Sequence, residues 1–455
     1  MTHIPAYRPL RAALLSATLL LSPVVHAQQE AAPAVPAADP AQTSEPEQPS
    51  EQVPPDAAPK PEAAPKPEAA PEAEAKKEKE KDKPWYERIK MRGYTQFRHN
   101  RLPSFRKNDE LVNDQGDRYI GDNNNFGIRR ARLIVFGEIG EHVSLYLQPD
   151  FASVIGDQYH VAILRDLYAD IFLDSKKEFR FRVGQSKVPF GFENLQSSQN
   201  RAPLDRSDAV NSALRDERDI GVFFYWAPKE IRERFKFLVD SGLKGSGDYG
   251  VVGLGVYNGQ NANRPERNDN VHTVGRLAWP FQFGQQFVEF NLAAYYGKYN
   301  VTVTPREGAP YALAGENDLV DARGLVSFVI YPQPIGFVAE YNFGKGPQLG
   351  SGDDRFTIDS RRLTGGYAQV MYKLDNVVGQ SLMPYARGTI YKGGKKFETN
   401  APRYDIRELE MGVEWQVAKA LEITGAYMIS DRTSSRYPYD KERGDVTRVQ
   451  VQVNY

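Results

Sequence analysis

Basic side chains occur at every second position in several short stretches of the sequence, and most of them are arginines. Such pairs are Lys90 with Arg92, Arg130 with Arg132, and Arg180 with Arg182. Residues two apart point to the same face of a β-strand, so each pair would present two cations together. Guanidinium groups offer paired N–H donors that match carboxylate and phosphate oxygens. The chemistry that this spacing indicates is the binding of small anions.

The residue patterns that catalysis or metal binding would need are missing. There are no cysteines, which excludes disulfides and thiolate metal sites. The six histidines show no metal-ligand spacing, and no nucleophile stands in a pattern with a base. A GxGxxG match at 245–250 runs into a strand-like stretch, so the helix that a bound dinucleotide requires is lacking. We expect no catalytic residues, no metal, no cofactor and no nucleic-acid partner.

The elements that must position the cations are β-strands, because hydrophobicity alternates with a period of two from Trp85 onward. In the first stretch Ile89 and Met91 alternate with Lys90 and Arg92, and the last strand runs to the end of the chain. We predict sixteen strands, at residues 88–98, 126–138, 142–152, 164–174, 178–187, 219–227, 249–258, 271–280, 286–303, 318–331, 334–344, 361–375, 381–392, 404–417, 420–430 and 444–455.

The connections between these strands alternate in length. Odd-numbered gaps are long, as at 99–125, 153–163 and 188–218, whereas most even-numbered gaps are tight, as at 139–141 and 418–419. Bacterial outer-membrane barrels have this asymmetry, with an even number of strands. Closing the sheet also gives the last strand a partner on each edge. We therefore predict an all-β fold, a 16-stranded antiparallel transmembrane β-barrel.

One even-numbered gap breaks this rule. Residues 227–248 contain RFKFLVD (234–240), which is either an extra strand or an excursion into the periplasm. With a second missed strand the barrel would have 18 strands.

The first 84 residues differ from the rest. Residues 1–27 have basic residues, a short apolar stretch and small residues before Ala27, which is typical of a secretory signal peptide. The apolar stretch is shorter than the roughly 20 residues that a membrane anchor needs. Residues 28–84 are rich in Ala, Pro, Glu and Lys, which predicts a disordered spacer in the periplasm. Residues 85–455 would form the barrel, in the outer membrane of a Gram-negative bacterium.

A barrel of sixteen strands encloses a water-filled lumen, and the polar face of each strand would line it. In the early strands this face is mainly basic, and in the later strands glutamates are frequent, so we expect one basic and one acidic wall. The expected basic wall contains Lys90, Arg92, Arg98, Arg130, Arg132, Arg180 and Arg182, set against Asp150, Asp166 and Asp170.

The longest connection with a strong charge pattern is 188–218, which carries Arg201, Arg206, Arg215 and Arg218. Loops of more than about 15 residues are usually functional. Folded inward, this loop would narrow the lumen and place arginines at the constriction. Alternatively it is an exposed loop whose charges face water or lipopolysaccharide.

Several motifs resemble the phosphate-selective porin O and P family: IRRARL (128–133), LQPDF (147–151), VGQSKVPFGFENLQSS (183–198) and RDIGV (218–222). The resemblance implies a trimeric outer-membrane channel of sixteen strands, with the loop before RDIGV folded into the lumen and basic residues that guide phosphate-type anions. The functional residues that it implies are Arg129, Arg130, Arg132, Asp150, Lys187 and Arg218. The inward glutamates of the later strands depart from a purely basic lining.

The function expected from these features is diffusion of small anions, such as phosphate or polyphosphate, through an outer-membrane porin. A general diffusion porin with weak selectivity and a tether to the cell wall through 28–84 remain as alternatives. A lipid hydrolase on the same barrel would need an outward Ser/His pair, which the histidine positions do not offer. The expected partners are small anions, outer-membrane lipid and lipopolysaccharide, two further copies of the chain, and the cell wall through the spacer.

Overall fold

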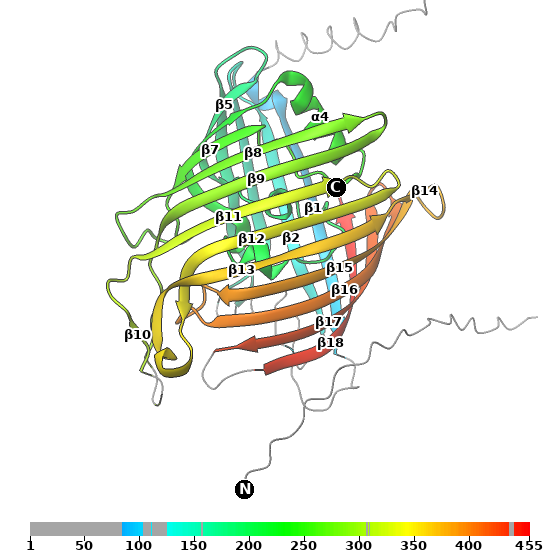
Figure 1. The fold of residues 1–455 in the computed structure, drawn as a ribbon. Coiled ribbons are helices and arrows are strands. Elements are labelled where there is room, and N and C mark those ends of the chain that lie inside the picture. Colours follow the sequence, from blue (N-terminus) through cyan, green and yellow to red (C-terminus); the bar gives the residue numbers. More distant parts are fainter. Residues whose placement is uncertain are drawn as a thin grey trace, which may run out of the picture. The chain divides into compact units, whose positions relative to one another are not determined.

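The computed structural model describes residues 84–102, 111, 125–155, 158–305, 308, 310–435 and 441–455. The expected signal peptide and nearly all of the expected spacer lie outside these residues. The described chain forms a closed β-barrel with a short helix in one turn and a folded loop inside it (Figure 1).

Sixteen long strands form the wall, and each of the sixteen predicted strands corresponds to one of them. They are β1 (Ile89–Arg101), β2 (Asn125–Glu138), β3 (Val143–Ile155), β4 (Gln158–Phe172), β5 (Phe179–Lys187), β6 (Arg218–Trp226), β7 (Val252–Tyr257), β8 (His272–Phe283), β9 (Gln286–Tyr299), β11 (Leu319–Ile330), β12 (Ile335–Leu349), β13 (Thr357–Tyr372), β15 (Ser381–Gly394), β16 (Arg403–Ala418), β17 (Leu421–Ser434) and β18 (Lys441–Asn454). Two-residue strands, β10 (Ala312–Leu313) and β14 (Leu374–Asp375), add to the sheet locally.

The barrel closes between its first and last strands. β1 and β18 pair antiparallel, from Tyr94 opposite Asn454 to Arg101 opposite Thr447. The terminal residue continues the ladder, because the amide of Tyr455 donates to the carbonyl of Gly93 and the amide of Gly93 donates back. The strand at the very end of the sequence therefore has neighbours on both edges, as predicted.

Short helices lie in the connections rather than in the wall. They are η1 (Trp85–Arg88), α2 (Phe192–Leu195), α3 (Asp208–Asn211), η2 (Arg215–Glu217), α4 (Lys229–Asp240) and η3 (Gly352–Asp354). Among the described residues, none of the helices has the length and apolar character to cross a membrane.

The suggestion of an extra strand at 234–240 is wrong, because these residues belong to α4. Ile231, Phe235 and Leu238 are its buried residues, and their spacing of four and three is that of one helix face. Gap 153–163 was also wrongly expected to be long, since β3 continues to Ile155 and β4 begins at Gln158.

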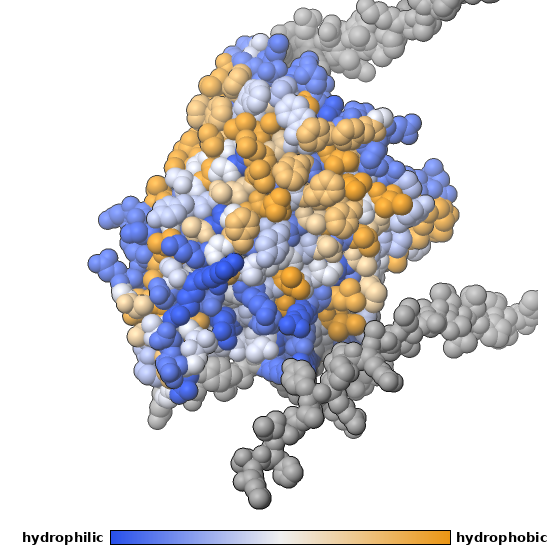
Figure 2. All heavy atoms as spheres, in the orientation of Figure 1, coloured by the Kyte–Doolittle hydropathy of each residue, from blue (hydrophilic) through white to orange (hydrophobic). Residues whose placement is uncertain are grey.

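The outer surface is apolar in a broad band. Its exposed side chains include Leu277 and Phe281 of β8, Phe290 and Leu292 of the neighbouring β9, and Val370 of β13. In Figure 2 hydrophobic residues cover much of the upper right part of the visible face, and hydrophilic residues gather at the lower left. An apolar outer band is what a barrel presents to lipid. We call the end with Tyr455, α4 and β14 the terminal end (Figure 1).

Candidate functional site

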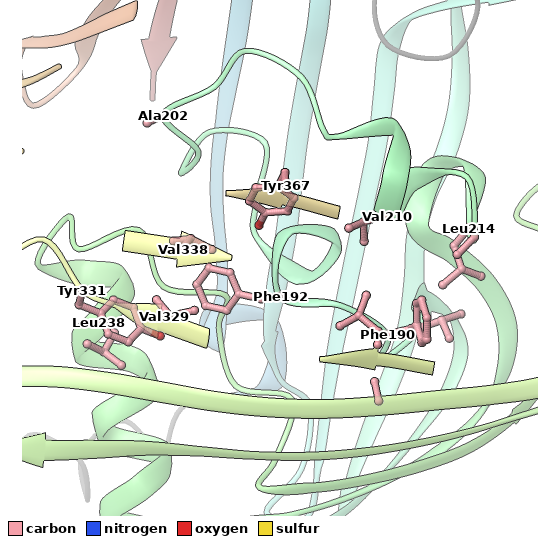
Figure 3. Packing of buried hydrophobic residues seen from close by; sticks show 14 of the residues in the cluster. Phe190, Phe192, Ala202, Val210, Leu214, Leu238, Val329, Tyr331, Val338 and Tyr367 are labelled. Atoms are coloured by element: carbon pink, nitrogen blue, oxygen red, sulfur yellow. The ribbon is translucent and has the colours of Figure 1, made fainter. Parts of the chain in front are cut away.

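The loop between β5 and β6, residues 188–217, lies inside the barrel and is called the inward loop. Its apolar side chains pack against the inner wall, where β11, β12 and β13 carry apolar residues (Figure 3). Phe190 lies edge-on to Tyr295, with ring centroids 4.8 Å apart, and Phe192 packs near Tyr331. The interpretation of 188–218 as an exposed loop is therefore wrong. This side of the lumen is filled rather than open.

Polar contacts fix the inward loop to the wall as well. The carboxylate of Glu340 on β12 accepts the backbone amides of Phe192 at 2.6 Å and Glu193 at 2.8 Å. The Glu193 carboxylate in turn binds Arg387 of β15 at 2.8 Å. At the start of the loop, the ammonium of Lys187 donates to two loop carbonyls, at 2.7 and 2.8 Å. These bonds hold the loop in one position across the lumen.

Asp205 lies at the middle of the inward loop and gathers four arginines from three strands. Its carboxylate is 2.7 Å from Arg98 of β1, 3.1 Å from Arg129 and 3.6 Å from Arg130 of β2, and it also pairs with Arg448 of β18. Burial would raise the pKa of Asp205, but Arg98 and Arg448 hold it well below its ordinary value. The carboxylate therefore stays charged among these cations.

A polar cavity lies between the inward loop and strands β2 and β4. Six arginines and three carboxylates line it together with one asparagine: Arg129, Arg130, Arg132, Arg165, Arg206, Arg215, Asp205, Asp216, Glu217 and Asn211. The centre of a water molecule can reach about 40 Å³ of space in this cavity. On the same measure a single water needs roughly 10–15 Å³. The excess of three positive charges makes it a site that attracts anions.

Two β-bulges bring additional arginines to this cavity. Gln96 pairs with Arg130 and Phe97 pairs with Ile128, so Arg129 is the extra residue in β2. In the β3–β4 pairing the register shifts in the same way, and Arg165 is the extra residue in β4. A bulge can turn a side chain toward the other face of the sheet. Arg165 lines the cavity but was not predicted. Asp166 was expected to face inward, and in a regular strand its neighbour Arg165 would then face outward.

Arg201 of the inward loop is buried without a hydrogen-bond partner. Only 4% of the residue is exposed, and among the described residues none of its three guanidinium nitrogens has a partner. Burial lowers its pKa, although Glu193 and Asp205 nearby favour the charged form. An unpaired buried cation is costly, so the arrangement suits a site in which an anion from solution supplies the missing partner.

The end of the inward loop is strained beside the cavity. Asp216 and Glu217 have φ angles of 62° and 63°, in the left-handed region that residues other than glycine rarely adopt. Each such residue costs on the order of 1–3 kcal/mol. Asp216 binds Arg165 at 2.7 Å, and Glu217 binds both Arg206 and Arg218. The strain is therefore held by ion pairs of the cavity itself.

Other expected site residues form ion pairs in the lumen wall, so their charges are largely neutralised. The pairs are Arg132 with Asp150 (2.8 Å), Arg182 with Asp170 (2.7 Å), Arg180 with Asp248 (2.9 Å), and Arg218 with Asp166 and Glu217 (2.9 Å each). Lys90 and Arg92 share the lumen-facing side of β1 with buried Gln96, but both are exposed. Of the thirteen expected residues, the cavity brings together Arg129, Arg130, Arg132, Arg206 and Arg215.

A second segment enters the lumen from the terminal end. After α4 the chain continues to Lys244, whose ammonium pairs with Glu414 of β16. The side chains of Gln196 and Asn200 in the inward loop donate to the carbonyls of Lys244 and Gly245. The two segments therefore touch inside the barrel. This contact was not predicted, because Asn200 and Gly245 are 45 residues apart and no local pattern links them.

Solved structures similar to this chain are outer-membrane proteins of low sequence identity. They include the channel DcaP of Acinetobacter baumannii (11% identity, TM-score 0.48, 81% of this chain and 97% of that one) and OprB of Pseudomonas putida (9%, 0.48, 81% and 95%). An anion-selective porin from Comamonas acidovorans is 10% identical, with a TM-score of 0.45, over 81% of this chain and 99% of that one. No curated protein matches the sequence.

The family comparison covers most of the chain. The profile of the phosphate-selective porin O and P family matches residues 107–455, which includes the inward loop and all strands after β1. With the closed barrel and its apolar outer band, this match places the chain in the outer membrane of a Gram-negative bacterium as a channel. The chain belongs to the phosphate-selective porin O and P family.

Proposed function

We propose that this channel favours anions and that small oxyanions such as phosphate pass through the arginine cavity beside the inward loop. The observation that carries the proposal is the composition of the cavity, six arginines against three carboxylates, with the unpaired guanidinium of Arg201 buried in the same loop. A surplus of positive charge in a confined space raises the local concentration of anions.

The geometry suggests how an oxyanion would be bound and released. Guanidinium groups donate two parallel hydrogen bonds to oxygens of one anion, which favours phosphate or carboxylate over a spherical ion. The neighbouring carboxylates of Asp205 and Glu217 already occupy several of these donors. A passing anion would thus exchange with an internal carboxylate, which keeps binding weak enough for release.

A general diffusion porin is the second candidate. It is favoured by the neutralised pairs in the wall, such as Arg182 with Asp170 and Arg218 with Asp166, which give a field across the lumen rather than a net positive lining. In that case, chloride and potassium would pass at similar rates and phosphate would not compete.

Arg201→Gln tests the proposal, because it removes the unpaired charge. In planar bilayers with chloride as the main ion, we expect phosphate to reduce the current of the unsubstituted channel. Arg201→Gln should require roughly 10- to 100-fold more phosphate for the same effect, the range for loss of one charge-assisted hydrogen bond.

Arg180→Gln is the matched control, since Arg180 is a lumen arginine that already pairs with Asp248. It should keep the phosphate effect. If the Arg201 and Arg180 variants respond alike, the proposed role of Arg201 in anion binding fails. If phosphate does not reduce the current at all, the proposed passage of oxyanions fails.

We further infer that the channel assembles as a homotrimer, that residues 1–27 are removed on export, and that 28–84 extend into the periplasm toward the cell wall. The family resemblance and the composition of these segments support this. Cross-linking of purified protein should give a trimer, and a predominantly monomeric product would contradict that inference. The N-terminal sequence of the mature protein should begin at Gln28, and a chain that still begins at Met1 would contradict the signal peptide.

A further inference from the structure

Cations gather on the outer face of four neighbouring strands, away from the terminal end. We call this group the outer cationic patch. It consists of Lys345 on β12, Arg362 on β13, Lys392 on β15, and Arg403, Asp405 and Arg407 on β16. β12, β13, β15 and β16 are consecutive in the wall, so the patch is continuous.

Like charges face each other in the patch. Lys345 and Arg362 are direct register partners in the antiparallel pair β12–β13. Two cations in this position repel each other and destabilise the sheet. Among the described residues, neither Lys345 nor Arg362 has an ion-pair or hydrogen-bond partner for its side chain, and both are exposed. The arrangement would be stabilised by an anion bound between them.

A single carboxylate cannot neutralise the patch. Asp405 lies 3.0 Å from Lys392 and 4.0 Å from Arg407, while Arg403 has no acidic partner among the described residues. Within these four strands five cations therefore face one acid. On the next strand, β17, Asp431 is the register partner of Arg407 and already pairs with Arg443 at 2.8 Å. The surplus is on the outside of the barrel wall, so it does not contribute to the lumen lining of the proposed channel.

Apolar residues adjoin the patch on the same strands, toward the terminal end. Phe343 on β12, Ile390 on β15 and Leu409 on β16 each stand two residues from a patch cation and are exposed by 50%, 58% and 42%. In Figure 2 the hydrophilic area at the lower left borders the hydrophobic area on this face. The change from apolar to cationic marks the height at which lipid chains give way to headgroups.

We propose that the outer cationic patch binds the phosphate groups of lipid A, the anchor of lipopolysaccharide, while its acyl chains lie along Phe343, Ile390 and Leu409. A phosphorylated lipid matches both parts of the surface, because its anions meet the cations and its chains meet the apolar side chains. Free phosphate would leave the apolar part without a partner.

The test uses a variant that removes three patch cations, Lys345→Gln, Arg362→Gln and Arg407→Gln, in the full-length chain in detergent. Bisphosphorylated lipid A should raise the unfolding temperature of the unsubstituted protein. The variant should need about a hundredfold more lipid A for the same rise in unfolding temperature, because the loss of each cation near an anionic surface weakens binding roughly fivefold.

A matched control removes three other outward cations, Arg101→Gln, Lys298→Gln and Lys441→Gln, whose register partners Thr447, Val320 and Thr433 are uncharged. It should respond to lipid A as the unsubstituted protein does. Unchanged bilayer conductance of the patch variant would show that the barrel has folded, and Arg362→Gln alone serves if the triple variant does not fold.

The proposal is overturned if the patch variant and the control respond equally, or if dephosphorylated lipid A stabilises the protein as well as the phosphorylated form. It is also overturned if inorganic phosphate alone reproduces the rise in unfolding temperature, because the patch would then be a site for free anions.

Discussion

Arg98 on β1 and Asp205 on the inward loop form a buried ion pair with a nitrogen–oxygen distance of 2.7 Å, and the same carboxylate reaches the arginines of β2. The channel therefore carries its own anion at the centre of its arginine cluster. This internal carboxylate competes with any anion from solution for the same donors.

Asp205→Asn should strengthen anion selectivity. The substitution keeps the size of the side chain but removes the charge that neutralises Arg98, Arg129, Arg130 and Arg448. We expect the reversal potential in a KCl gradient to move toward the chloride equilibrium potential. Phosphate should also reduce the current at lower concentration.

Asp205→Glu is the control, because it retains the carboxylate, and it should stay close to the unsubstituted channel. A shift of the Asp205→Asn channel toward cation selectivity would contradict the role given to this residue, since it would mean that the loop had left its position.

The strand pattern could be predicted from the sequence because one face of each strand meets lipid and the other faces the lumen. Apolar and polar side chains therefore alternate along the strand with a period of two. Each of the sixteen segments was found, although their bounds shifted. Alternation also identified Arg130 and Arg132 as inward. It could not place Arg129 or Arg165, because a bulge adds one residue and reverses the faces, and a single sequence carries no clear sign of it.

The helix and the centre of the site were harder to predict. RFKFLVD alternates well enough to suggest a strand, and only the longer spacing of Ile231, Phe235 and Leu238 indicates α4. Asp205 was not singled out, because its importance comes from arginines of β1, β2 and β18 that lie far away in the sequence. Such convergence depends on barrel closure rather than on any local pattern.

Acid should release the segment that holds α4. Burial alone would raise the pKa of Asp248, but Arg180 and Arg232 lower it to about 2. A carboxyl group whose folded pKa is depressed contributes stability above its ordinary value near 3.8, and this stability is lost as the pH falls from about 4 to about 2. The contribution is on the order of 2 kcal/mol.

Hydrogen exchange of residues 229–248 measures this release. Asp248→Asn should speed exchange there at neutral pH. Asp240→Asn should not, because the Asp240 pair with Lys236 is exposed on the surface of α4. Equal exchange in the two variants would show that the Asp248 ion pairs do not hold the segment.

The seam of the barrel should be sensitive at Gly93. A Cβ atom there would lie 2.3 Å from the ring of Tyr455 and 2.5 Å from the carbonyl oxygen of Arg132. We expect Gly93→Ala to destabilise the barrel by about 1–3 kcal/mol, which is the usual cost of overpacking. Urea unfolding of the purified barrel measures the difference.

Gly425→Ala is the control for the seam, because a Cβ atom at this position on β17 would meet nothing within 4 Å. It should unfold at nearly the same urea concentration as the unsubstituted protein. If Gly93→Ala is tolerated as well as Gly425→Ala, the ring of Tyr455 does not pack over Gly93 as described.

The arginine surplus beside the inward loop should make the channel select anions, and the reversal potential of the unsubstituted channel in a KCl gradient measures this selectivity. We predict a potential on the anion-selective side that moves further when Asp205 is replaced by asparagine, with phosphate competing for the current. A cation-selective potential, or an unselective one that phosphate leaves unchanged, would contradict it.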